Sequence, residues 1–204
     1  MAAQTAAAAP QPAWARARQT ITSALRHPEG WARARLTEPS AGQTDLIDAG
    51  ALLGVAAAGV GAYGLALHLP RGIEAGLIGA AAAAGGAGIA WVTTLPTLLI
   101  VGALLGSPLR PRAVLYAAMV TVSFAGLAMA ASVPVLWFFS WAAPSLRILC
   151  VLASFLGVGL CMADVFLRVM GALERRRFLH VLWLGLLGVT GAEMFFVLGL
   201  FSGL

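Results

Sequence analysis

The scarcity of charged residues after Ile47 is the feature that most constrains this chain. From Ile47 to Leu204, ionisable side chains occur only in small groups, and the apolar stretches between them are long enough to cross a bilayer. Hydrophobic residues make up 60% of the 204 residues and charged residues 10%, and the mean hydropathy is +0.90. A soluble domain of this length cannot bury so much apolar surface. The sequence therefore predicts an all-α, polytopic transmembrane helical bundle, with lipid as the solvent for most of the chain.

Five apolar segments are predicted to span the membrane. They cover residues 47–69, 72–106, 113–137, 146–169 and 178–201. The second segment is longer than the roughly 20 residues that one span requires, and it contains Pro96. We interpret it as one long, tilted or kinked helix in which Thr93 and Thr94 satisfy carbonyls freed by the proline. A re-entrant or broken segment around Pro96 is the alternative.

The arginines predict the orientation of these spans. All 13 basic residues are arginine, and five spans with a cytoplasmic N-terminus put eleven of them on the cytoplasmic side. The outer segments then contain only Arg71 and Arg147. Positive residues concentrate in cytoplasmic loops, so the sequence predicts a cytoplasmic N-terminus and an outside C-terminus. The run Arg175, Arg176 and Arg177 is interpreted as a basic anchor that faces anionic lipid headgroups.

Two parts of the chain differ in polarity. Residues 1–45 are predicted to form a cytoplasmic arm with a flexible tail and a short amphipathic helix, and residues 46–204 the five-helix membrane domain. Within the arm, Trp14, Ile21 and Leu25 share one helical face and arginines surround it. Such a helix suits the headgroup layer. A solvated arm whose arginines only fix the orientation is the alternative.

Small residues predict how the first two spans pack. They form two columns in steps of four residues: Gly50, Gly54 and Ala58, and then Gly76, Ala80, Ala84 and Gly88. Such columns let helix backbones approach closely. We expect them to serve internal packing, with dimerisation as the alternative. The third to fifth spans are bulkier and are expected to face lipid or a partner subunit.

Charged residues inside the predicted spans form two candidate intramembrane sites. Asp164 lies four residues before Arg168, which predicts an ion pair near the cytoplasmic end of one helix. Glu193 lies in the outer half of the last span. Inserting an acidic side chain at the centre of the bilayer costs about 2.5–3.5 kcal/mol. Arg147 is its predicted partner. Glu193 is either a structural ion pair or neutral acid, or a proton or ligand site.

Catalytic, cofactor and metal sites are not predicted. The chain has no lysine for a Schiff base or a phosphate-binding loop, and it lacks the common hydrolase and metal motifs. Cys150 and Cys161 are eleven residues apart in one helix, so both are expected to be free thiols. His180 is a weak candidate for a haem or pigment ligand. The basic charge is explained by membrane orientation, so no nucleic acid is expected as a partner.

The segments ITSALRHPEGW at 21–31 and TTLPTLLIVGALLGS at 93–107 give the chain a layout that resembles the Yip-like five-span membrane proteins. The resemblance covers about residues 20–200, and it implies a cytoplasmic arm with a short helix followed by five helices. The Asp-Leu-Tyr and Gly-Pro signature of the eukaryotic branch is absent, so binding of Rab-type GTPases is not implied. The resemblance implies a membrane scaffold or a trafficking-type partner and not a particular reaction.

These observations predict a non-enzymatic integral membrane protein that serves as a subunit, anchor or scaffold of a larger assembly. Its expected partners are the anionic bilayer surface and other membrane subunits or a second copy of itself. The alanine- and arginine-rich, lysine-free composition is typical of a GC-rich bacterial genome, so the expected location is the bacterial inner membrane. The alternative function is a small proton-linked carrier or channel that uses Glu193.

Overall fold

The computed structural model describes residues 12–37, 42–107, 111–173, 179–186 and 188–189. Its α-helices are α1 (Ala13–Arg26), α2 (Pro28–Thr37), α3 (Gly42–His68), α4 (Ile73–Leu104), α5 (Pro111–Ala142) and α6 (Arg147–Leu173). Single 3-10 turns, Leu69–Arg71 and Pro144–Leu146, connect α3 to α4 and α5 to α6. The part of the chain that the structure describes contains no strand, which confirms the all-α prediction.

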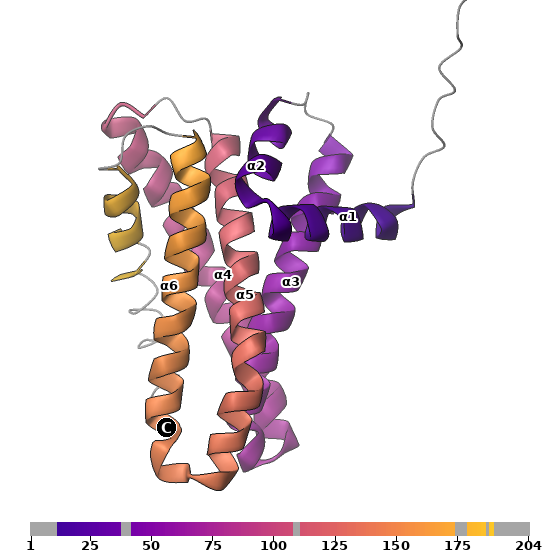
Figure 1. Cartoon of the computed structure of the whole chain (residues 1–204), viewed down its shortest axis with the longest axis vertical. Coiled ribbons are helices and arrows are strands. Elements are labelled where there is room, and N and C mark those ends of the chain that lie inside the picture. The colour runs from indigo at the N-terminus through magenta and orange to yellow at the C-terminus, as the bar shows by residue number, and fades with distance from the viewer. Residues whose placement is uncertain (1–11, 38–41, 108–110, 174–178, 187, 190–204) are drawn as a thin grey trace, which may run out of the picture.

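Four helices in the described ranges, α3 to α6, are long and apolar enough to cross a membrane. They stand side by side in alternating directions because each connection is short (Figure 1). Residues 179–186 and 188–189 are helical and belong to the predicted fifth span, but the rest of that span lies outside the described residues. The described chain is therefore a membrane-type helical bundle.

Helix α4 continues through Pro96 without a break, so the re-entrant alternative is wrong. Its 32 residues extend roughly 48 Å, more than the hydrocarbon thickness of about 30 Å. Pro96 cannot donate a hydrogen bond to the carbonyl of Val92. The hydroxyls of Thr93 and Thr94 instead donate to the Ala90 carbonyl, at 3.0 and 2.6 Å. Neither hydroxyl donates to the freed Val92 carbonyl in these bonds, so the prediction that Thr93 and Thr94 satisfy carbonyls freed by the proline is wrong.

Helix α5 forms the centre of the bundle and packs against both α3 and α6. Every residue from Tyr116 to Ser123 is buried, so this part of α5 is covered all round. The prediction that the third span faces lipid or a partner is therefore wrong. The size of the side chains does not determine the exposure of α5. Small residues such as Ala117 and Gly126 alternate with large ones along this helix, so neighbouring helices can approach it on several sides.

Backbones approach most closely at two glycine pairs. A Cβ atom added at Gly59 of α3 would lie 1.9 Å from the carbonyl oxygen of Gly126 in α5. A Cβ atom at Gly64 of α3 would lie 2.5 Å from the carbonyl oxygen of Gly79 in α4. Neither seam has room for a side chain, so glycine is required at both crossings.

The predicted small-residue columns only partly coincide with these seams. Gly50, Gly54 and Ala58 are exposed, and no described residue lies within 4 Å of a Cβ atom built on either glycine, so the internal packing role predicted for this column is wrong. In the second column, Gly76 packs against Leu65 of α3, Ala80 and Ala84 are half-buried, and Gly88 is exposed.

The physical reason is helical drift. A step of four residues rotates about 40° beyond a full turn, so a strict four-residue column winds away from a neighbouring helix. In the first half of α4 the buried small residues alternate steps of three and four instead, and they are Gly76, Gly79, Ala83 and Gly86.

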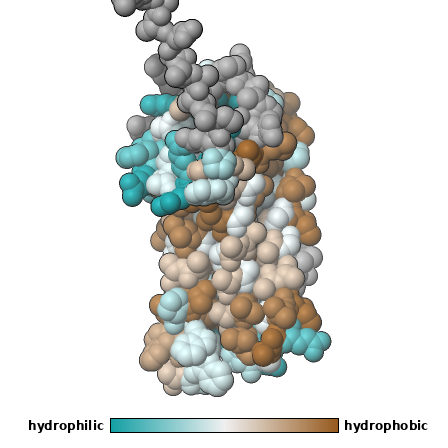
Figure 2. Space-filling model, turned by 90° about the vertical axis from the view of Figure 1, so that its right-hand side faces the viewer, coloured by the Kyte–Doolittle hydropathy of each residue, from teal (hydrophilic) through white to brown (hydrophobic). Residues whose placement is uncertain are grey.

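The polar arm is packed onto one end of the bundle. Helix α1 runs across the bundle axis over α3, while α2 stands against α5 and α6 (Figure 1). Ala24 and Ala32 are fully buried at this junction, whereas Trp14, at the far end of α1, is 70% exposed. Hydrophilic residues gather at the arm end above a largely hydrophobic surface (Figure 2). The arm is therefore not an independent solvated segment in the described ranges, and its predicted tail lies outside them.

Candidate functional site

A buried carboxylate fastens the arm to the bundle. Asp48 of α3 has no exposed surface, and its Oδ2 lies 2.8 Å from Nη2 of Arg35 in α2. The hydroxyl of Thr20 in α1 donates a hydrogen bond to Oδ1 of the same carboxylate. One side chain of α3 thus holds both arm helices. Leaving such a buried charge without its partner costs about 3–5 kcal/mol.

The contacts continue from this ion pair into the core. The guanidinium of Arg35 lies over the Trp31 ring, 5.8 Å from its centroid. Trp31 meets Tyr116 of α5 edge to face, with ring centroids 5.5 Å apart. The Tyr116 hydroxyl accepts hydrogen bonds from Nε and Nη2 of Arg112, at 3.2 and 3.0 Å. The α3 carboxylate of Asp48, the α2 pair Arg35 and Trp31, and the α5 pair Tyr116 and Arg112 therefore form one continuous chain of contacts at the arm end.

A further contact joins the arm to α6. Nε of Arg33 in α2 donates to the carbonyl of Ala172, at 3.2 Å. Ala172 lies in the last turn of α6, where carbonyls have no partner within the helix. Arginine at a helix C-terminus also interacts favourably with the helix dipole.

The sequence prediction does not include this junction. Asp48 is a further acidic residue inside a predicted apolar span, one residue after the start of that span at Ile47. A carboxylate at such a position needs a partner, which is the signal that points to a nearby cation. The choice of Arg35 among the arginines of the arm depends on how α2 folds back, and no sequence pattern specifies that.

Arg147 occupies the opposite end of the bundle. Its Nη2 donates to the carbonyl of Leu67 in the last turn of α3, at 2.6 Å, so the first residue of α6 caps the end of α3. Its predicted partner, Glu193, lies outside the described residues. The basic anchor predicted at Arg175, Arg176 and Arg177 also lies outside them.

The second predicted pair is present in the structure. Nη2 of Arg168 lies 2.8 Å from Oδ2 of Asp164, one helical turn apart on α6. Both side chains are at least half exposed, at 50% and 65% respectively, so the pair lies on the outer surface of the bundle. Exposed pairs of this kind contribute about 0–1 kcal/mol.

A large cavity lies between α4, α5 and α6 in the middle of the bundle, with a volume of about 480 Å³. Its described lining is apolar apart from threonine hydroxyls and the Trp91 indole, and it contains no ionisable side chain. The hydroxyls of Thr94 and Thr121 both donate to carbonyls of their own helices. The described walls therefore offer no group that takes up a proton or holds an ion.

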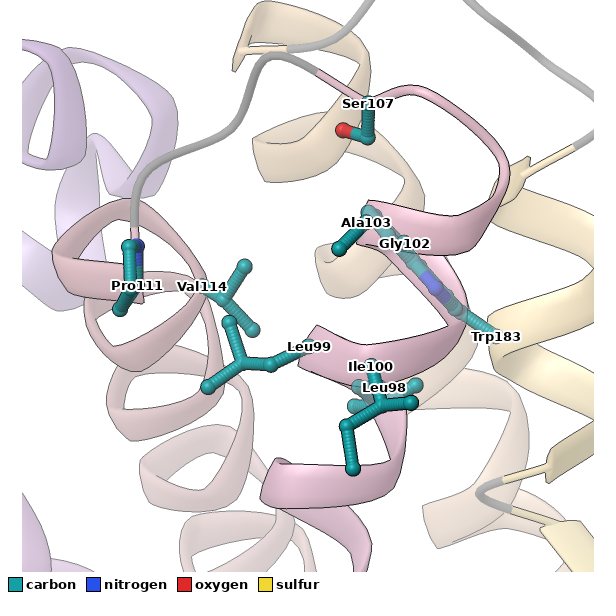
Figure 3. A pocket seen from close by; sticks show the side chains of 9 residues that line it. All are labelled: Leu98, Leu99, Ile100, Gly102, Ala103, Ser107, Pro111, Val114 and Trp183. Carbon is teal, nitrogen blue, oxygen red and sulfur yellow. The ribbon is translucent and has the colours of Figure 1, made fainter.

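A smaller cavity of about 320 Å³ lies at the arm end, between the last turns of α4 and the start of α5 (Figure 3). Its walls include Leu99, Gly102 and Val114, with Ser107 and Trp183 also on its surface. Trp183 is 1% exposed, and its Nε1 has no hydrogen-bond partner among the described residues.

His180 lies one helical turn before Trp183 and is 5% exposed. Its Nε2 also lacks a hydrogen-bond partner within the described ranges. No group of three or more histidine, cysteine, aspartate or glutamate side chains gathers closely enough among the described residues to hold a metal ion. Cys150 and Cys161 are free thiols, as predicted.

Comparison with protein-family models found no matching family, and searches of curated proteins and of solved structures found no match. The resemblance to the Yip-like proteins therefore stays a prediction, and the function has to be argued from the residues described above.

Proposed function

We propose that this chain is a five-span protein of the bacterial inner membrane that acts, without catalysis, as a subunit, anchor or scaffold of a larger membrane assembly. The arm end faces the cytoplasm and the C-terminus lies outside. The observation that carries the proposal is the outer surface of α4. Only 17% of its most apolar 18-residue window is buried, although the helix is long enough to span a bilayer.

The outer surfaces have the composition of a helix-docking face. Some exposed glycines have no neighbour within 4 Å of a Cβ atom in the part of the chain that the structure describes, and they include Gly54 on α3, Gly85 and Gly88 on α4, and Gly157 on α6. Small residues on a membrane-facing surface let a second helix approach closely enough for dispersion contacts. Large apolar neighbours such as Val92, which is 70% exposed, provide the remaining contact area.

The arginine distribution supports the orientation. Seven of the nine arginines in the described ranges lie at the arm end, and Arg71 and Arg147 lie at the other end. Trp137 and Trp141 are more than half exposed at that other end, as expected for an interfacial aromatic belt.

Native mass spectrometry of the protein, extracted from its own membrane with a mild detergent, tests the proposed function. We expect partner chains, or a second copy, at fixed stoichiometry. A bare monomer that moves a solute after reconstitution would overturn the proposal in favour of the carrier that uses Glu193.

Matched glycine variants then locate the contact surface. Gly54→Leu and Gly88→Leu change exposed positions and should release the partner while the chain keeps its helical content and thermal transition. If both variants still copurify with the partner, these surfaces are not the interface. Reporter fusions at each terminus test the orientation separately, and the proposal requires opposite sides.

A further inference from the structure

Helix α1 lies at the level where α3 enters its apolar span. That span begins at Leu46, and the hydroxyl of Thr20 in α1 donates to Asp48, two residues further along. Leu46 is 74% exposed, so α3 already presents an apolar side chain at this level. Because α1 runs across the bundle axis (Figure 1), its whole length stays near the same level. For a bundle that spans a bilayer, this level is the boundary between headgroups and hydrocarbon, and α1 is parallel to it.

One face of α1 is apolar and only partly covered by the bundle. Thr20 and Ala24 are buried against the bundle, whereas Trp14 is 70% exposed. A rotation of about 100° per residue puts Trp14, Ile21 and Leu25 on one face, roughly a quarter turn from the line of Thr20 and Ala24. Ile21 and Leu25 are half-buried. We call these three side chains the apolar face of α1.

The direction of α1 determines where the apolar face points. Helix α1 passes in front of α3 and runs from right to left in Figure 1, with the arm end of the bundle at the top. Residues of a right-handed helix rotate clockwise when viewed from its N-terminus. The apolar face lies a quarter turn clockwise from the buried line, so it points down, along α3 and away from the arm end. It is therefore turned toward the hydrocarbon side of the boundary.

The remainder of the α1 surface is cationic. Arg16, Arg18 and Arg26 lie off the apolar face, and the segment Ala13–Arg26 contains no acidic residue. In the part of the chain that the structure describes, no acidic side chain forms an ion pair with any of these three arginines. Hydrophilic side chains at the arm end project beyond the side of the bundle, above a hydrophobic surface (Figure 2). An aromatic and aliphatic face combined with arginines is typical of helices that lie in the interface plane.

We propose that α1 is an interfacial helix that binds the anionic lipid surface of the cytoplasmic leaflet. Trp14 enters the upper part of the acyl layer, and the guanidinium groups of Arg16 and Arg18 contact lipid phosphates. The hydrogen bond from Thr20 to Asp48 holds the helix at this depth. Lipid is favoured over an acidic protein because the apolar face points along the bundle, where the bilayer lies. The inference relies on the proposed membrane location and orientation.

The test uses the full chain without Cys150 and Cys161, with a fluorophore on one introduced cysteine, in vesicles of phosphatidylglycerol and phosphatidylcholine. A nitroxide near the headgroup end of an acyl chain quenches fluorophores at the boundary. The label of Trp14→Cys should be quenched, whereas that of Gln19→Cys, an exposed position on the polar side of α1, should not. Val92→Cys on the exposed surface of α4 is read with a nitroxide deep in the acyl chain. It establishes insertion, so failure of the membrane proposal is detected separately.

The charge preference is measured by attaching the shallow nitroxide to either lipid at equal content. Phosphatidylglycerol should quench the label of Trp14→Cys about fivefold more strongly, the ratio expected from one arginine near an anionic surface. Adding Arg16→Gln and Arg18→Gln should remove that preference, whereas Arg71→Gln at the opposite end should retain it. Equal quenching of the two α1 labels in inserted protein, or no preference for phosphatidylglycerol, would overturn the proposal. Protection of the Trp14→Cys label by a partner chain and not by lipid would also overturn it.

Discussion

Helices α4 and α5 have the same length and almost the same hydropathy, yet they occupy opposite environments. Each has 32 residues, and their most apolar windows have mean hydropathies of 1.8 and 1.9. The α5 window is 72% buried, whereas the α4 window is 17% buried. Hydropathy therefore identifies a membrane-spanning helix but does not say whether lipid or protein surrounds it.

The polar side chains show what distinguishes the two helices. On α5, the Ser123 hydroxyl is fully buried and donates to the carbonyl of Leu52 in α3, at 2.9 Å, as well as to that of Met119 in its own helix. On α4, the exposed Thr93 hydroxyl donates only within its own helix in the bonds described. Ser123 thus forms a hydrogen bond across the α3–α5 interface, although the buried Thr121 of α5 donates within its own helix, as Thr93 does on α4.

The contact between the arm and the bundle is buried, as the interior of α5 is. Removal of the Arg35 guanidinium from this contact should lower the free energy of unfolding more than any other substitution considered below. Arg35→Ala leaves Asp48 buried and uncompensated, so we expect a loss of about 3–5 kcal/mol in unfolding free energy. Arg168→Ala breaks the exposed pair on α6 and should cost less than about 1 kcal/mol. Thermal or denaturant unfolding in detergent measures both. Equal effects would mean that Asp48 is not buried by the arm.

The close crossing of α3 and α5 at Gly59 can be compared with the exposed side of α3 at Gly54. Gly59→Leu places a side chain against the Gly126 backbone, which cannot move aside as a flexible side chain does. We expect a cost at or above the upper end of the roughly 1–3 kcal/mol typical of overpacking. Gly54→Leu, on the exposed side of the same helix, should leave the thermal transition unchanged. A stable Gly59→Leu protein would contradict the close crossing.

The same valine-to-alanine substitution in each helix compares the burial of α5 and α4 directly. Val120→Ala removes two methyl groups from the fully buried centre of α5 and should lower the unfolding free energy by about 2 kcal/mol. Val92→Ala makes the same change on α4, where the side chain is 70% exposed, and should cost less than about 0.5 kcal/mol. Reversal of this order would place α4 inside the bundle and α5 outside.

A smaller effect than at Val120 is expected for the capping arginine at the end opposite the arm. Arg147→Ala removes the cap from the Leu67 carbonyl and should cost about 1 kcal/mol. Arg147→Lys keeps the charge and a donor, so it should recover part of the loss. Hydrogen exchange in the last turn of α3 is the sensitive readout. Unchanged protection in the alanine variant would show that the capping bond contributes nothing.

Sequence alone predicted the all-α class and the existence of the long helices, because apolar length is a local property. It also predicted the Asp164–Arg168 pair, since four-residue spacing on a helix determines that contact. It did not identify the interior helix, the Gly59–Gly126 crossing or the Asp48–Arg35 bond. Those depend on how each helix is rotated and on which segments meet, and residues far apart in the chain decide both.

Oxygen accessibility of single spin labels is the measurement that tests the central claim most directly. Labels would be introduced one at a time over residues 85–96 of α4 and 113–124 of α5, in a variant without Cys150 and Cys161, after reconstitution into lipid. The account predicts a helical period of accessibility along α4, with a maximum around Gly88 and Val92, and uniform protection along α5 from Tyr116 to Ser123, with accessibility at Leu115, which is 47% exposed. Equal periodic accessibility along both helices would contradict a bundle built around α5.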